Sequence, residues 1–309
     1  MRRVAALTLP VFAGTMLLQV NTIVDRMFAS GLPVGSISAL NYAGKVNGMI
    51  VSIVAASIST VALPALSRAA ANKDLARLRG TMLLAIRGMN LIIIPMTVGM
   101  LVLCRPLVQL LFERGAFDAH ATSLTATALL YLSLGLFAYA LRDIFSRAFY
   151  ALQDTVTPMI NSGITIAVNI VLLVLLVPPY GLAGMAGATS LSGVFSGIQL
   201  FWRLRRKIGQ AGGREIFTSM LRVILAAGIM GVVVHFFYPL AEGAVPGAGF
   251  VPRLIVITAC SALGAAVYGG ALWLLRAKEI KIAMDLIGSR GGNAREAIIE
   301  EEATITRLD

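Results

Sequence analysis

Polar and charged side chains interrupt the apolar sequence near residue 45 in a pattern that could bind an anion. Asn41, Lys45, Gly48 and Ser52 would share one face of a helix. A lysine at the centre of a bilayer costs about 2.5–3.5 kcal/mol, a cost that a water-filled cavity largely removes. Two interpretations stay open: this face lines such a cavity, or Lys45 extends to the membrane surface while the small residues pack against a neighbouring helix. The polar face that Lys45 shares favours the cavity.

A second polar group ends the preceding apolar run. Asp25 and Arg26 lie beside each other there, one turn after Asn21. An intramembrane carboxylate is functional by default, so Asp25 is a candidate cation or proton site. An Asp25–Arg26 ion pair at the membrane surface is the structural alternative. Farther along, Asn169 interrupts an apolar run, where an asparagine commonly joins two helices. Thr189 could offer an oxygen to an ion or bond to its own helical turn.

The composition places the chain in a membrane. Of 309 residues, 58% are hydrophobic and 13% are charged, and the mean hydropathy is +0.84. These values are typical of a protein that crosses the bilayer several times. The net charge of +11 comes from lysines and arginines in short clusters between apolar runs, so a nucleic-acid partner is not indicated. The sequence contains no phosphate-binding loop, metalloprotease motif or nucleophile elbow, so an enzyme is disfavoured.

Apolar runs separated by glycine and proline predict an all-α bundle of about eight transmembrane helices. An even number of spans puts both termini on the same side of the membrane. Lysine and arginine collect in the connections on that side, so both termini are expected in the cytoplasm. The mixed-charge stretch 276–309 is expected to be a cytosolic tail. The predicted spans are 5–28, 39–63, 82–103, 122–145, 158–177, 183–202, 218–238 and 253–275.

Two further motifs predict packing. In "LLFERGAFDA" (110–119), Glu113 and Arg114 are expected to pair beside the membrane surface. The spacing of Gly193 and Gly197 is a G-x-x-x-G motif, which indicates a close helix contact. The motif alone does not distinguish a neighbour in the same chain from another subunit.

Three segments together resemble the MurJ (MviN) lipid II flippase family. They are "LPVFAGTMLLQVNTIVDRMFASGLPVGSISALNYAGKVNG" (9–48), "LLFERGAFDA" (110–119) and "RAFYALQDTVTPM" (147–159), and the resemblance runs from Leu9 to Lys207. Family members have fourteen spans in two six-helix lobes and a final helix pair. The resemblance implies that residues 1–207 are the second lobe, that 208–275 are the final pair, and that the amino-terminal lobe is a missing partner.

The resemblance also implies a function and its site residues. It implies flipping of the undecaprenyl-diphosphate-linked peptidoglycan precursor lipid II across the bacterial cytoplasmic membrane by alternating access, with no cofactor beyond a coupling sodium ion or proton. Lys45 matches a cavity arginine of the family, and Asn41, Ser52 and Arg26 would complete the headgroup surface. A sodium site attributed to this lobe would match Asp25, Asn169 and Thr189. A further oxygen ligand of that site aligns with Leu173, where this sequence departs from the family.

Two alternatives remain beside the flippase. The chain could belong to a related transporter that exports a polysaccharide-linked lipid or a drug. It could instead be a non-transporting scaffold or an inactive fragment that assembles with other proteins through the Gly193 and Gly197 face. If the chain is part of a flippase, lipid II and membrane lipids are its expected partners.

Overall fold

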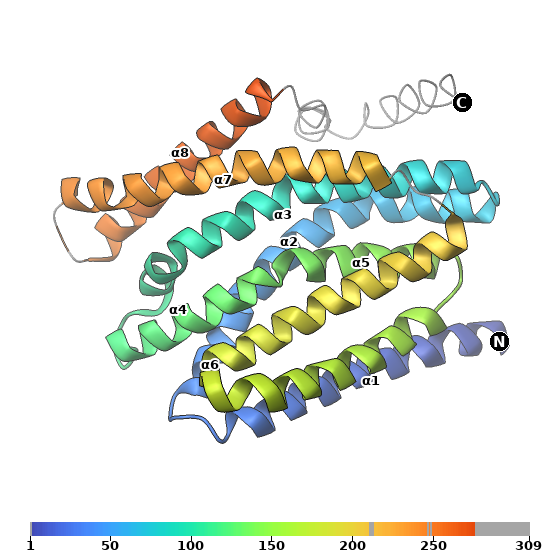
Figure 1. The fold of residues 1–309 in the computed structure, drawn as a ribbon, viewed down its shortest axis with the longest axis horizontal. Coiled ribbons are helices and arrows are strands. Elements are labelled where there is room, and N and C mark those ends of the chain that lie inside the picture. The colour runs from blue at the N-terminus through green and yellow to red at the C-terminus, as the bar shows by residue number, and fades with distance from the viewer. Residues whose placement is uncertain (1, 210–212, 246, 248, 276–309) are drawn as a thin grey trace.

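The chain is a bundle of long helices (Figure 1). The computed structural model describes residues 2–209, 213–245, 247 and 249–275, and every regular element within them is an α-helix. The predicted all-α fold is therefore confirmed, while the predicted tail 276–309 lies outside the described residues. The helices are α1 (Arg2–Ala29), α2 (Ser36–Ala71), α3 (Leu75–Phe112), α4 (Ala119–Leu134), α5 (Leu136–Ala151), α6 (Val156–Ile208), α7 (Gly213–Ala244) and α8 (Phe250–Leu274).

Several of these helices are suited to a bilayer. In the described part of the chain, four are long and apolar enough to cross it, namely α3, α6, α8 and residues Phe217–Ala244 of α7. A fifth is added if α4 and α5, which are bent by 46° against each other, form one span. Helices suit this environment because each satisfies its own backbone hydrogen bonds. The composition-based prediction of a membrane helix bundle thus agrees with the structure.

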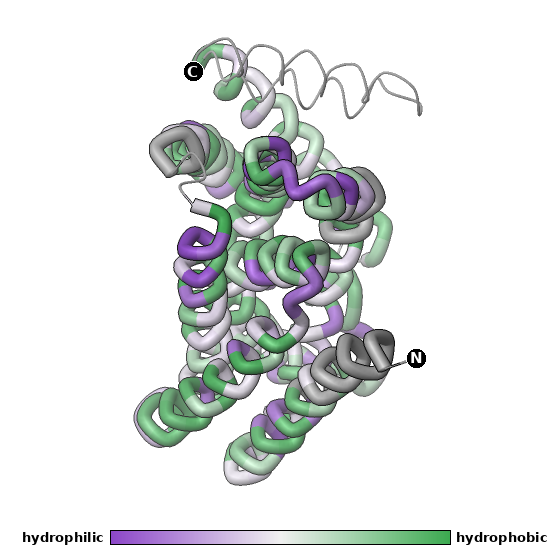
Figure 2. Tube along the Cα trace, turned by 90° about the vertical axis from the view of Figure 1, so that its right-hand side faces the viewer, coloured by the Kyte–Doolittle hydropathy of each residue, from purple (hydrophilic) through white to green (hydrophobic). Residues whose placement is uncertain are grey.

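The helix connections gather at two opposite ends of the bundle (Figure 1). One end holds the start of α1, the α2–α3 turn and the α5–α6 connection, and we call it the basic end because the clustered lysines and arginines lie there. The other end holds the α1–α2, α3–α4 and α7–α8 connections. Figure 2 looks onto the basic end and shows hydrophilic stretches at the near ends of several helices. The connections with clustered lysines and arginines, which alternate along the sequence with connections that have few, therefore lie together at one end of the bundle.

Helix α6 is a hairpin of two antiparallel arms. Its regular geometry is broken at Gly181, which has φ 55° and ψ −127°. The two predicted spans 158–177 and 183–202 lie in the arms on either side of this break. The arms are joined by a buried hydrogen bond in which Asn161 Nδ2 donates to Ser196 Oγ at 2.7 Å. An amide that bonds across two helices in this way is a typical source of cohesion inside a bilayer.

The hairpin turn leaves no space for a side chain at Gly184. A β-carbon there would lie 2.0 Å from the carbonyl oxygen of Leu176 in the opposite arm. Gly187, one turn farther on, has ordinary room, because its β-carbon would lie 3.9 Å from the Tyr131 ring. The close contact between the two arms therefore depends on Gly184 and not on Gly187.

The predicted span 122–145 is not one straight helix. The chain bends at Gly135 between α4 and α5, where a β-carbon would lie 2.8 Å from Ser190 Cα in α6. Ser190 Oγ donates to the Tyr131 carbonyl at 2.6 Å, so it satisfies a backbone group that the break would otherwise leave unpaired. The bend was not predicted because Ser190 lies 55 residues farther along the sequence.

The G-x-x-x-G motif is used inside the chain. A β-carbon at Gly193 would lie 2.9 Å from the Tyr139 ring, and one at Gly197 would lie 3.3 Å from the Ala138 carbonyl oxygen. Both contacts are made by α5. Because α5 already covers this face of α6, the face is not free to bind another subunit.

A salt bridge closes the basic end. Lys207 Nζ, at the end of α6, lies 2.6 Å from Asp154 Oδ2 in the α5–α6 connection. The same carboxylate accepts hydrogen bonds from the backbone and the hydroxyl of Thr157. Burial opposes ionisation of Asp154, but the bonds from Lys207 and Thr157 outweigh it and hold its pKa below the ordinary value.

A second salt bridge closes the opposite end, and it corrects a prediction. Glu113 does not pair with Arg114, because its Oε1 lies 3.0 Å from Arg253 Nη2 at the start of α8. Thr122 Oγ1 donates to the other oxygen of Glu113 at 2.9 Å. Burial opposes ionisation here as well, but the bonds from Thr122 and Arg253 lower the pKa of Glu113. Glu113 therefore ties α8 to α3 and α4.

Substitution of Gly184 by alanine should destabilise the hairpin, because its β-carbon would overlap the Leu176 carbonyl. Overpacking of this kind costs about 1–3 kcal/mol. We expect a clearly lower midpoint of thermal unfolding in detergent for Gly184→Ala, with Gly187→Ala close to the parent protein. Equal midpoints for the two variants would show that the arms separate at no cost.

The Asp154–Lys207 contact should make stability depend on pH in acid. Because the folded pKa of Asp154 lies below its unfolded value of about 3.9, its contribution is complete above that value and is lost as the pH falls through the folded pKa. The parent protein should unfold at a higher temperature than Asp154→Asn at pH above about 5, and this gap should close below about pH 4. A gap that is unchanged at the lowest pH would contradict the assignment.

Candidate functional site

Helix α2 is divided lengthwise into a buried face and an exposed polar face. Asn41, Lys45, Gly48 and Ser52, which we call the α2 stripe, are all exposed. On the opposite face, Ala43 is fully buried, and Val46 and Val54 are buried too. The α2 stripe, which sequence periodicity placed on one face, thus lies on the surface of the chain. Met49 and Ile53 are exposed next to it, so the surface is amphipathic.

Lys45 lies beside an aromatic cluster. Its Nζ is 5.7 Å from the centre of the Tyr42 ring, within the range of a cation–π contact. The Tyr42 ring in turn contacts Phe112 at 4.8 Å and Phe117 at 5.4 Å between ring centres. No carboxylate lies within 4.0 Å of Lys45 among the residues that the structure describes. The ammonium group is therefore positioned by a ring and keeps its charge uncompensated.

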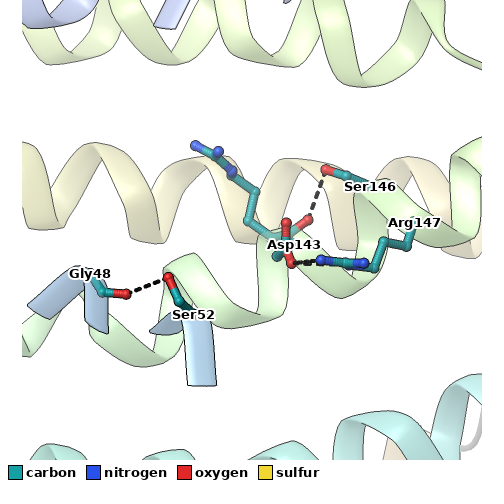
Figure 3. A network of polar contacts seen from close by, with 6 residues as sticks. Gly48, Ser52, Asp143, Ser146 and Arg147 are labelled. Atoms are coloured by element: carbon teal, nitrogen blue, oxygen red, sulfur yellow. Dashed lines mark hydrogen bonds and ion pairs between the residues drawn. The ribbon is translucent and has the colours of Figure 1, made fainter. Parts of the chain in front are cut away.

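Ser52 and a polar face of α5 continue this region (Figure 3). Ser52 Oγ donates to the Gly48 carbonyl at 2.7 Å in its own helix. On α5, which packs against α2, Arg147 donates to Asp143 with 2.8 Å between Nη2 and Oδ2. The guanidinium of Arg142 lies 5.8 Å from the Tyr139 ring centre. The sequence showed this charged α5 segment, but nothing in its spacing indicated that it would lie on a helix packed against α2.

Asp25 belongs to a polar cluster that joins α1 to α6. Asn169 Nδ2 lies 3.0 Å from Asp25 Oδ1 and 3.1 Å from Asn21 Oδ1. Asn21 Nδ2 also donates to Asp25 Oδ2 at 3.2 Å. We call these three residues the Asp25 cluster. Its contacts confirm the prediction that Asn169 joins two helices.

Arg26 is not the partner of Asp25. It is exposed on α1, and the described residues contain no ion pair between the two. The surface ion pair that the sequence left open is therefore absent. Asn21 was the member of the cluster that site prediction omitted. Its spacing of four residues from Asp25 was the signal that could have found it, because residues i and i+4 are neighbours on a helix.

Thr189 and Leu173 lie at the positions where the family's sodium site has further oxygen ligands. Thr189 Oγ1 donates to the Met185 carbonyl at 3.1 Å in its own turn, as the sequence allowed. Its own carbonyl accepts a hydrogen bond from Tyr139 OH at 2.8 Å. Leu173 is fully buried in the apolar cluster beside these residues and offers no oxygen. The structure thus brings Asp25 and Asn169 together directly, and Thr189 makes no direct contact with either among the described residues.

The Asp25 cluster has the chemistry of a site for a hard cation. Carboxylate and amide oxygens are the ligands that such ions prefer. Asn169 is 1% exposed, and its Oδ1 has no hydrogen-bond partner among the described residues. A buried amide oxygen without a partner is costly unless another group satisfies it. The donor set therefore fits a small cation better than it fits an apolar environment.

Comparison with known proteins identifies the fold and the family. The family model described as "Lipid II flippase MurJ" matches residues 1–251. The probable lipid II flippase MurJ of Rhizobium meliloti is 30% identical over 234 residues, which are 76% of this chain and 44% of that protein. The protein of the same description from Vibrio cholerae is 30% identical over 286 residues, covering 92% of this chain and 54% of its own length. The chain thus spans about half the length of the curated relatives it matches.

The structural comparison gives the same result. The structure described as lipid II flippase MurJ in an inward closed conformation has a TM-score of 0.71 and 27% identity, over 92% of this chain and 55% of that one. An outward-facing multidrug resistance transporter of the MATE family has a TM-score of 0.57 at 20% identity, covering 88% of this chain and 64% of that one, and shares only the fold. The match of the family model to most of the sequence decides between the two groups: the chain belongs to the MurJ family of lipid II flippases.

Proposed function

We propose that this chain forms one half of a lipid II flippase, which moves the undecaprenyl-diphosphate-linked peptidoglycan precursor across the bacterial cytoplasmic membrane by alternating access. Membership of the family supports this activity. The observation that carries the proposal is the α2 stripe, an exposed polar face with an uncompensated lysine on a helix whose other face is buried. A polar face of this kind in a membrane protein requires water or another protein surface against it.

The proposed architecture is a six-helix lobe followed by a helix pair. Residues 1–207 form the lobe, 208–275 contribute two further spans, and 276–309 are a cytosolic tail. The division of α6 into two arms at Gly181 supports the count of eight spans. The gathering of basic connections at one end supports a cytoplasmic location for that end and for both termini. A second six-helix lobe, supplied by a partner, would cover the α2 stripe and close the cavity.

The anion in the proposed substrate is the diphosphate. Lys45 would attract it, and Arg26 on α1 would add a second positive charge. Asn41 would donate a hydrogen bond, and Ser52 would do so by rotating its hydroxyl away from the Gly48 carbonyl. A lysine is a point charge without the two-pronged geometry of an arginine, so it suits a diphosphate that slides through a wet cavity. All four side chains are exposed on the chain, as this role requires.

The coupling ion is proposed to be sodium, or else a proton, held at the Asp25 cluster. The carboxylate of Asp25 would supply the charge, and Oδ1 of Asn169 would supply a second oxygen once the amide turns its Nδ2 away from Asp25. Thr189 would join this set by rotating its hydroxyl away from the Met185 carbonyl. Because the cluster joins α1 to α6, occupancy would strengthen the contact between these two helices.

Two other functions have less support. A related exporter of polysaccharide-linked lipid or of drugs shares the fold, but the likeness to the drug transporter is at 20% identity. A scaffold that assembles through Gly193 and Gly197 lacks a free surface, because α5 already covers that face.

Removal of the Lys45 charge should impair lipid II transport. We expect Lys45→Ala, expressed with a complementary six-helix lobe in flippase-depleted cells, to reduce translocation by about tenfold or more, since a hydrogen bond to a charged group contributes about 1.5–3 kcal/mol. Lys45→Arg should keep most activity, and Arg105→Ala, a charge on the exposed surface of α3, should be neutral. Full transport by Lys45→Ala would exclude the proposed role.

Sodium should stabilise the chain through Asp25. We expect the midpoint of thermal unfolding in detergent to rise when potassium is exchanged for sodium at constant ionic strength, because an ion that binds only the folded state stabilises it. The rise should vanish in Asp25→Asn and persist in Asp143→Asn, whose carboxylate is paired with Arg147. An equal rise in all three proteins would place the ion elsewhere.

A further inference from the structure

We propose that a cavity between α3, α7 and α8 binds a phosphoethanolamine group carried by a membrane phospholipid. The cavity lies at the end of the bundle opposite the basic end and has a volume of about 210 Å³. It is separate from the α2 stripe and the Asp25 cluster. The inference goes beyond the proposed flippase function and does not depend on it.

The walls of the cavity carry charges of both signs. Gln109 comes from α3, Tyr238 and Glu242 come from α7, and Arg253 comes from α8. Pro106 and Val256 belong to its apolar lining. Apolar walls with a few convergent polar groups are typical of sites for small ligands.

The two opposite charges share the cavity without neutralising each other. Among the described residues, no cation lies within 4.0 Å of the Glu242 carboxylate, whose partner is Tyr238 OH at 3.3 Å. The guanidinium of Arg253 uses Nη2 for Glu113 and makes no other hydrogen bond within the described part of the chain. A carboxylate and a guanidinium that line one small space and stay apart are complementary to a ligand that carries both charges.

Glu113 explains why the two charges stay apart. Its carboxylate holds Arg253 from the side of α3, and Thr122 holds that carboxylate in turn. The guanidinium is therefore fixed on one wall and cannot rotate freely to Glu242. This salt bridge leaves the remaining N–H groups of Arg253 available for a phosphate, which an arginine binds well because of its planar array of donors.

The location favours a membrane lipid over a dissolved compound. Phe250, Val251 and Leu254 are exposed on the first turns of α8, next to Arg253 in the sequence, with 56%, 62% and 42% of their surface accessible. Acyl chains would cover such side chains while the headgroup enters the cavity. The volume of about 210 Å³ is many times the roughly 10–15 Å³ that one water molecule needs, so the cavity has room for a compact headgroup.

The ammonium group distinguishes this headgroup from others. A primary ammonium donates hydrogen bonds to a carboxylate, whereas the trimethylammonium of choline has no N–H to donate. A glycerol headgroup carries no positive charge for Glu242. The site should therefore prefer phosphatidylethanolamine to both phosphatidylcholine and phosphatidylglycerol.

Native mass spectrometry of the full chain, released from vesicles with equal amounts of the three lipids, tests the proposal. We expect phosphatidylethanolamine to be retained about tenfold more than either competitor. Glu242→Gln should abolish this preference, and Tyr238→Phe should weaken it. Arg105→Gln, which removes an exposed charge of α3 outside the cavity, should leave the preference unchanged.

The outcomes separate the alternatives without relying on Arg253, whose replacement also breaks the bond to Glu113. Equal retention of the three lipids, or an unchanged preference in Glu242→Gln, would overturn the proposal. Free phosphoethanolamine provides the second arm, measured by its effect on the midpoint of thermal unfolding. If free phosphoethanolamine raises the midpoint only at concentrations far above those at which phosphatidylethanolamine acts, the ligand is the lipid. If both raise it over the same concentration range, the acyl chains contribute nothing and the proposed lipid source is wrong.

Discussion

A bilayer accepts a polar side chain only where protein or water satisfies it, and this constraint separates the polar residues of the chain into two groups. The first group forms hydrogen bonds within the chain. Asn169, Asn161 and Ser190 each join two helix segments through hydrogen bonds. The second group, the α2 stripe, has no such partners in the described structure and lies on the surface. The first group holds the helices together, and the second marks a surface that requires water or protein against it.

The positions of the helices were largely readable from the sequence, whereas their partners were not. Local signals placed several of the breaks, since clusters of proline and glycine favour the end of a helix, and the division of α6 at Gly181, just after Pro178 and Pro179, is an example. Single prolines did not break their helices, because Pro64, Pro95 and Pro239 lie inside α2, α3 and α7. The stripe on α2 was predictable because periodicity is a property of one helix. The bend at Gly135 depends on Ser190, and the partner of Glu113 lies 140 residues away, so neither could be derived from nearby residues. The spacing placed Asn21 one turn before Asp25, but Asn21 was not included among the predicted site residues.

Helices α7 and α8 are attached to α3 at several levels. Tyr268 OH of α8 donates to the Leu91 carbonyl of α3 at 2.8 Å, and Arg253 binds Glu113 near the opposite end of the same helix pair. The buried side chains of α3, α7 and α8 also form a shared apolar cluster that includes Leu103, Met230 and Cys260. Helix α3 thus packs against α2, α4 and α5 as well as against α7 and α8. A motion of α3 would therefore carry α7 and α8 with it.

The exposure of Lys45 beside Met49 and Ile53 also bears on how long the protein persists in a cell. A helix with an ammonium group and two large apolar side chains on one surface is well solvated neither by hydrocarbon nor by water. Any surface that covers this face would stabilise the folded chain, so the chain is expected to be more abundant in a cell that supplies such a surface than in one that does not.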